Sequence, residues 1–126
     1  MKKNFSTSWK SSRKPGKQRK YRLNAPLHIK QKFTGTHVSK EIRQKIKKRS
    51  VDLRKGDKVK VMRGQFKKHE GKVDRVDLRK SLIFVNGVEA TKKDGSKRLI
   101  GINPSNLMIT ELNMDDKIRQ KTLESK

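Results

Sequence analysis

The stretch that most constrains the fold is residues 55–76. Val59 and Val61 alternate there with Lys58 and Lys60, and a period of two gives a strand one apolar face and one solvated face. A basic loop follows this strand, and a second apolar alternation follows the loop. The sequence therefore predicts two strands of a sheet that hold a short basic loop between them.

The loop between these predicted strands is bounded by Gly64 and Gly71, which can adopt backbone angles closed to residues with a side chain. Lys67 and Lys68 make the loop basic, and Phe66 is its one large apolar side chain. Rigid strands are therefore expected to present a basic loop that carries an aromatic ring.

This arrangement resembles the KOW motif, an RNA-binding signature of ribosomal proteins and transcription elongation factors. The matching residues are Gly56, Asp57, Val59, Val61, Gly64, Lys67, Gly71, Val73 and Val76. The chain departs from the motif at Lys68, where many members of the family have a glycine. The lysine adds a positive charge. Because it replaces a glycine, the sequence does not determine the backbone conformation of the loop at this position.

The charge of the whole chain indicates a polyanionic partner. Its 36 Lys and Arg residues against 12 Asp and Glu give a formal net charge of +24. Such an excess repels itself unless a polyanion neutralises it, and nucleic acid is the usual one. A membrane surface is the other candidate. However, the sequence has no long apolar run and no amphipathic segment rich in Trp, Phe and Leu, so no membrane insertion is expected.

No cofactor or metal is expected. The chain has no cysteine for a disulfide or a thiolate metal site, and His28, His37 and His69 lack the spacing of zinc ligands. No apolar signal segment follows Lys2 and Lys3, so secretion is not indicated and a cytoplasmic protein is expected.

The positive charge is concentrated in a basic arm, residues 1–50, which holds 17 of the Lys and Arg residues and a single acid, Glu41. This asymmetry indicates a basic extension attached to a better balanced domain. We therefore expect a basic arm over residues 1–50, a barrel over residues 51–112, and a C-terminal helix or tail over residues 113–126; the KOW resemblance makes RNA the expected partner of the arm.

Aromatic residues are unusually frequent in the basic arm, which contains Phe5, Trp9, Tyr21 and Phe33. Flat side chains among cations can stack on exposed bases. Alternatively, they pack back onto the barrel. The segment from Arg13 to Arg22 is too charged to pack against protein and resembles a free basic tail.

One short helix is expected in the basic arm, over about residues 40–48. Ser39 is suited to cap its N-terminus, and Val38, Ile42 and Ile46 fall four residues apart, which gives one apolar stripe among basic side chains. The stripe is expected to dock on the barrel while the basic faces meet phosphates.

About five short strands joined by tight turns predict a small closed barrel in residues 51–112. Broken alternation predicts a bulge near residues 74–75, while Asn86-Gly87 and Asp94-Gly95 are turn pairs. Residues 99–102 and 107–109 are expected to form later strands.

The C-terminal residues 113–126 are expected to form a surface helix, with Asp115 and Asp116 at its start and Arg119 and Lys121 near its end. Its apolar positions are few, and no function is assigned to it.

Catalysis is not expected. Asp52, Asp57, Asp74 and Asp77 lie among Lys and Arg on predicted strand and turn surfaces, where charge balance is their expected role. No nucleophile lies near a plausible base in the sequence, so the chain is not expected to be an enzyme.

Several motifs in order extend the resemblance from about Lys10 to the C-terminus. They are Ala25-Pro26-Leu27-His28, Leu53-Arg54-Lys55-Gly56-Asp57, Val61-Met62-Arg63-Gly64, Gly71-Lys72-Val73, Val76-Asp77-Leu78 and Asn103-Pro104-Ser105-Asn106-Leu107. Together they resemble the archaeal and eukaryotic branch of the universal large-subunit ribosomal protein family twenty-four. The basic arm is typical of that branch, and the short C-terminal tail is typical of its archaeal members.

The resemblance implies a mainly β fold: an SH3-like barrel with a basic N-terminal arm that contains a short helix, and a short C-terminal helix. It further implies a structural constituent of the large ribosomal subunit. The family binds the 5′ domain of large-subunit rRNA near the peptide exit tunnel and joins early in assembly. Its implied partners are rRNA, neighbouring large-subunit proteins and factors at the tunnel exit.

The expected rRNA contacts come from motif position in the barrel, and from charge and motif position together in the basic arm. Those in the barrel are Arg54, Lys55, Arg63, Gln65, Phe66, Lys67 and Lys68. Those in the arm are Lys10, Arg13, Lys14, Lys17, Arg19, Lys20, Arg22, His28, Lys30, Lys32, Lys40, Arg43, Lys47 and Arg49.

Two other functions share some of these features. A transcription elongation factor also carries a KOW domain, but it would be expected to bring a separate polymerase-binding domain. A chromatin-type DNA-binding protein shares the charge, and preference for duplex DNA over folded RNA would identify it.

Overall fold

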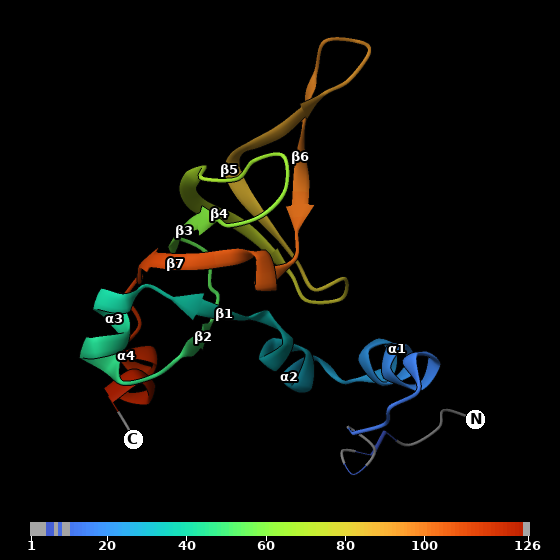
Figure 1. The fold of residues 1–126 in the computed structure, drawn as a ribbon, viewed down its shortest axis with the longest axis vertical. Helices are drawn as coiled ribbons and strands as arrows, with labels where there is room; N and C mark the ends of the chain where they lie inside the picture. Colours follow the sequence, from blue (N-terminus) through green and yellow to red (C-terminus); the bar gives the residue numbers. More distant parts are fainter. Residues whose placement is uncertain (1–4, 7, 9–10, 125–126) are drawn as a thin grey trace.

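The computed structural model describes residues 5–6, 8 and 11–124. Seven strands form one sheet in the order β2-β1-β7-β3-β4-β5-β6, and they wrap into a small barrel-like domain with short helices around it (Figure 1). The strands are β1 Gly35–Val38, β2 Ser50–Asp52, β3 Lys58–Val61, β4 Glu70–Asp77, β5 Leu82–Thr91, β6 Lys97–Ile102 and β7 Leu107–Glu111. The helices are α1 Pro15–Asn24, α2 Leu27–Lys30, the 3-10 helix η2 Gln31–Thr34, α3 Lys40–Ile46, the 3-10 helix η3 Pro104–Asn106 and α4 Lys117–Glu124. The predicted mainly β fold with short helices is confirmed.

The core forms where alternating strand residues face inward. In β3 the side chains of Val59 and Val61 are buried while those of Lys58 and Lys60, which alternate with them, are not, as the period of two predicts. Antiparallel pairing with β4 and β7 brings these valines against the other apolar strand faces. The buried cluster is Val38, Leu53, Val59, Val61, Val73, Ile83, Val85, Val88, Leu107 and Ile109.

Five strands, β3 to β7, lie within residues 51–112 as expected, β2 lies across the boundary with the basic arm, and the arm adds β1, which was not predicted. β1 pairs in parallel with β7, with Val38 opposite Ile109, and antiparallel with β2. Thr36 and Val38 point into the protein and are almost fully buried. The sequence signal was weak because β1 is four residues long and one of its two inward side chains is a threonine.

Helix α3 follows β1 directly. The Ser39 hydroxyl accepts a hydrogen bond from the Ile42 backbone N–H at 3.4 Å, which caps the helix as its sequence predicts. Ile42 and Ile46 pack against the core, so the apolar stripe docks on the barrel. Lys47, with φ of +57°, ends the helix in the left-handed conformation.

One of the three register shifts among the described strands was predicted. The β4–β5 pairing shifts register between Val73 and Arg75, which confirms the bulge near residues 74–75. The turn predicted at Asn86-Gly87 was wrong, because β5 continues through it to Thr91. Gly87 has φ of +90° and lies within a second register shift, while Val88 returns to the core with no exposed surface. The strand therefore continues because burial of Val88 outweighs the local turn preference.

Beyond this bulge, β5 and β6 extend away from the barrel as a long hairpin (Figure 1). The turn at Asp94-Gly95 is present as predicted, with Gly95 at φ of +90°. The Lys92 N–H donates to the Ser96 carbonyl at 2.8 Å and closes the tip.

The C-terminal helix α4 is attached by a buried ion pair as well as by Leu123, which is only 4% exposed. Ile118 is 71% exposed, whereas Arg119 is only 4% exposed. The Arg119 guanidinium donates two hydrogen bonds, both of 2.6 Å, to the two carboxylate oxygens of Asp57. The expectation that Asp57 lies on the surface was therefore wrong, because a bidentate partner from the far end of the chain permits its burial.

The remaining hydrogen-bonding groups of this ion pair are also satisfied. Asp57 accepts from the backbone N–H of Arg54 at 3.0 Å and of Asn113 at 2.8 Å. Arg119 donates to the carbonyls of Asn113 and Asp52. A buried ion pair stabilises a fold only when its other bonds are made, and here they link α4, β2 and the turn before β3.

The outer arm, residues 11–34, lies to one side of the sheet (Figure 1). No helix was expected from Arg13 to Arg22, but α1 begins with Pro15 at its first turn and is helical to Asn24. No residue of α1 is buried, so the helix packs little against protein.

The aromatic residues of the arm contact one another. The ring centroids of Phe5 and Tyr21 lie 4.9 Å apart, and those of Tyr21 and Phe33 lie 6.1 Å apart. The Arg22 guanidinium lies over the Phe33 ring, 5.4 Å from its centroid. Trp9 lies outside the described residues.

Candidate nucleic-acid interface

The KOW loop, residues 64–71, is held in shape by backbone hydrogen bonds. The Lys67 N–H donates to the Gly64 carbonyl at 3.2 Å, and the His69 N–H donates to the Phe66 carbonyl at 3.0 Å. Val61 exchanges two further bonds with the end of the loop: its carbonyl accepts from Lys68 at 2.8 Å and its N–H donates to the His69 carbonyl at 2.9 Å. The loop therefore presents its side chains from a fixed backbone.

Lys68 occupies a glycine-like position in this loop. Its φ of +73° is in the left-handed region, which disfavours residues with a Cβ atom. The departure from the KOW pattern thus changes the residue without changing the backbone conformation that a glycine would favour. The loop carries strain at Lys68 in exchange for an additional exposed cation.

His69 fastens the KOW loop to β5. Its Nε2 lies 2.9 Å from the Asn86 carbonyl oxygen. A Cβ atom at Gly87 would lie 2.6 Å from the imidazole ring, so the ring and the glycine fit together only because Gly87 has no side chain. Sequence analysis assigned His69 no such role. The Asn-Gly pair was the available signal, but it was interpreted as a turn.

The exposed side chains of the KOW loop and its entry are basic or polar at Arg63, Gln65, Lys67 and Lys68, and acidic at Glu70 at the end of the loop. Phe66 differs from them, because it is half-buried and packs against the hydrophobic core. The aromatic ring therefore attaches the loop to the core instead of being exposed to solvent.

The turn before β3 places Arg54 and Lys55 on the surface near the start of the same strand. The Asp57 carboxylate and Gly56, with φ of +95°, fix this turn. Arg54 forms an ion pair with Asp116, which precedes α4. That pairing and a hydrogen bond from the Ile118 N–H lower the pKa of Asp116, so the carboxylate is charged at neutral pH.

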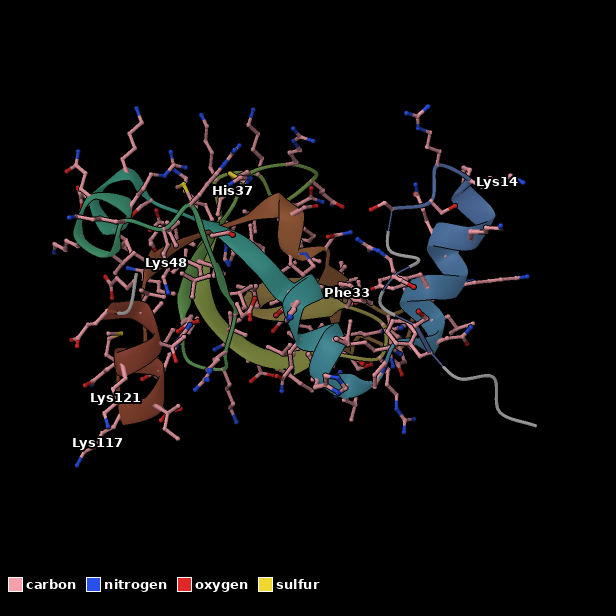
Figure 2. All side chains as sticks on the ribbon, turned by 90° about the horizontal axis from the view of Figure 1, so that it is seen from below. Lys14, Phe33, His37, Lys48, Lys117 and Lys121 are labelled. Atoms are coloured by element: carbon pink, nitrogen blue, oxygen red, sulfur yellow. The ribbon has the colours of Figure 1, made fainter. Side chains whose placement is uncertain are left out.

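The cations of the basic arm lie mostly on exposed surfaces, while Lys10 lies outside the described residues. The exposed ones are Arg13, Lys14, Lys17, Arg19, Lys20, Arg22, His28, Lys32, Lys40, Arg43, Lys47 and Arg49. Lys30 is the exception, with only 8% of its surface exposed. Figure 2 shows Lys14 at the start of α1, far from the labelled lysines of α4. The structure thus spreads the predicted arm residues along the molecule instead of gathering them at one point.

Lys48, which was not among the predicted contacts, holds two helices together. Its Nζ donates to the Thr122 carbonyl at 2.6 Å and so joins the residues after α3 to α4 (Figure 2). Because carbonyls at the end of a helix lack partners within it, a lysine is well suited to bind there.

The described residues offer little for other chemistry. They contain no group of three or more His, Asp or Glu placed to hold a metal ion. No helix among them is long and apolar enough to cross a membrane.

Comparison with known proteins agrees with the charge and the fold. Residues 12–126 match the family model that describes the ribosomal proteins called L26 in eukaryotes and L24 in archaea. A protein of Methanothrix thermoacetophila named large ribosomal subunit protein uL24 is 49% identical over 110 residues, which cover 87% of this chain and 95% of that protein. A protein of the same name from Methanosphaera stadtmanae is 42% identical over 115 residues, which cover 91% and 98%. The chain belongs to the ribosomal protein family that comprises eukaryotic L26 and archaeal L24.

Proposed function

We propose that this chain is a non-catalytic structural constituent of the large ribosomal subunit and that it binds large-subunit rRNA. The observation that carries the proposal is the set of exposed cations on the KOW loop, α1 and α3, which outnumber the two acidic residues there, Glu41 of α3 and Glu70 at the end of the loop. RNA phosphates are the counterions that this surface lacks. The names of the two archaeal relatives support the same partner.

The barrel and the outer arm have different tasks in this mechanism. The KOW loop is fixed to the sheet by His69 and Phe66, so it determines the position at which the protein binds the RNA. The outer arm enlarges the surface that contacts RNA beyond the barrel. Its helix α1 is free to do so because it buries no residue in the protein. Leu23 and Leu27, 73% and 58% exposed, become covered when RNA or a neighbouring protein packs against the arm.

The finer placement follows from the family resemblance. The chain binds the 5′ domain of the rRNA near the peptide exit tunnel, joins early in subunit assembly, and contacts neighbouring large-subunit proteins and factors at the tunnel exit. It acts in the cytoplasm as part of the ribosome.

Sedimentation of a lysate tests this function. The chain should travel with large subunits through a sucrose gradient, and the purified chain should prefer folded rRNA to duplex DNA at matched salt. Co-purification with RNA polymerase would favour an elongation factor instead. A preference for duplex DNA would favour a chromatin-type protein.

A further inference from the structure

A pocket of about 670 Å³ lies where the outer arm meets the barrel. We name it the junction pocket. Its volume is within the range of sites that hold a small organic group. The lining residues come from η2, the segment between β2 and β3, and β4: Gln31, Thr34, Asp52, Leu53, Arg54, Lys55, Asp74, Arg75, Val76 and Leu78.

Three kinds of side chain line the junction pocket. Leu53, Val76 and Leu78 are apolar and suit the face of a flat ring. Arg54, Lys55 and Arg75 are exposed cations that attract phosphate. Asp52 and Asp74 are carboxylates, which repel phosphate and can only accept hydrogen bonds when ionised.

Neither pocket carboxylate accepts a hydrogen bond from any residue that the structure describes. This sets them apart from Asp77 and Asp94, whose side chains accept bonds from nearby backbone N–H groups. Burial raises the pKa of Asp52, although the charges of Arg119, Arg54 and Lys32 oppose this effect. A ligand that donates hydrogen bonds would therefore satisfy groups that the protein itself leaves without donors.

We propose that the junction pocket binds one unpaired guanine of the RNA, an inference that rests on the proposed function. Guanine presents two adjacent donors, N1–H and N2–H₂, which match the two oxygens of the Asp74 carboxylate. Adenine and cytosine each place an acceptor beside their amino group, and uracil flanks its one N–H with two carbonyls, so each would face repulsion. The apolar residues cover the ring, and the cations at the rim hold the flanking phosphates.

Asp74→Asn in the full-length chain tests this inference, because the guanine site and simple electrostatics predict opposite changes in rRNA affinity. The change makes the chain more positive, so electrostatics alone would tighten RNA binding. Loss of the bidentate acceptor should instead weaken rRNA binding by roughly tenfold. Asp115→Asn, at an exposed position outside the pocket, is the matched control and should leave binding equal or slightly tighter. Equal or tighter binding by both variants overturns the inference.

Kethoxal, which modifies guanine at N1 and N2, gives a second measurement on the rRNA complex. One unpaired guanine should be protected by the wild-type chain and by Asp115→Asn, and should regain its reactivity with Asp74→Asn. Melting temperatures of the free variants should agree, which excludes unfolding as the cause.

The two proposals fail differently. If the wild-type chain does not prefer rRNA, the proposed function is wrong. If it binds rRNA but no guanine depends on Asp74, or a neighbouring protein fills the pocket, only the guanine site is wrong.

Discussion

The outer arm and the barrel carry charges in opposite ways. In the barrel, Asp57 and Arg119 are both buried and fully hydrogen-bonded to each other and to the backbone. In the outer arm, α1 contains no acidic residue and buries no side chain. The comparison teaches that charge alone does not decide which part of a basic chain packs into the protein interior. Packing follows from whether the neighbouring residues allow a charge to be paired and buried.

The largest expected effect concerns the barrel. Arg119→Leu should lower the free energy of unfolding by about 3–5 kcal/mol, because it leaves the Asp57 carboxylate buried without its partner. Lys121→Leu, an exposed position on the same helix, is the control and should change it by less than about 0.5 kcal/mol. Urea denaturation followed by circular dichroism measures both. Equal stability of the two variants would show that the ion pair does not hold α4.

The next effect concerns the arm. Compared with a chain that begins at Ser11, a chain that begins at Ala25 lacks α1 and the six exposed cations between Arg13 and Arg22. The slope of log binding constant against log salt should decrease by up to about 4, because each phosphate contact to a single strand contributes about 0.7. The urea midpoint should stay the same, since α1 buries no residue. An unchanged salt dependence of rRNA binding would remove the outer arm from the interface.

A smaller effect separates strain from charge within the KOW loop. Lys68→Gly should stabilise the free protein by about 1 kcal/mol, because Lys68 has a positive φ. Lys67→Gly removes the same charge where φ is not positive, and should destabilise it by about 0.5–1 kcal/mol. Thermal unfolding compares the two, and both variants should lose a similar amount of rRNA affinity. The same stability change in both would mean that no strain is present at Lys68.

The smallest effect concerns the pocket between the two regions. The pKa of Asp52 is raised in the folded protein, so its ionised form disfavours folding. The protonated form of Asp52 adds to the free energy of unfolding. This contribution is fully present below the pKa of the unfolded state, near 3.8, and is lost as pH rises through the pKa of the folded state. Asp52→Asn should therefore raise the melting temperature slightly at neutral pH, and the gain should disappear toward pH 3. A gain that does not depend on pH would have another cause.

Sequence patterns predicted the elements whose burial follows a regular period. The alternation of Val59 and Val61, the cap at Ser39 and the stripe of Ile42 and Ile46 all form as expected. The resemblance to the KOW motif also singled out Lys68, which has a positive φ.

The sequence could not reveal features that depend on distant partners. The sequence of a short polar helix does not show whether its arginine faces water or a buried carboxylate. Only the folded chain brings Arg119 to Asp57. Similarly, Asn86-Gly87 resembles a turn until His69 and the buried Val88 hold it within a strand. The rRNA contacts remain a prediction, because the structure places these cations on the surface without their partner.

The parallel pairing of β1 with β7 has a consequence for the order of synthesis. His37 leaves the ribosome long before Met108, the residue it must meet, and Arg119 reaches Asp57 later still. The sheet therefore cannot be completed until β7 has emerged, and α1 emerges with its cations well before the fold that will carry it. Chains arrested at residue 106 should accordingly be cut by protease throughout residues 35–61, whereas the released protein resists cleavage there.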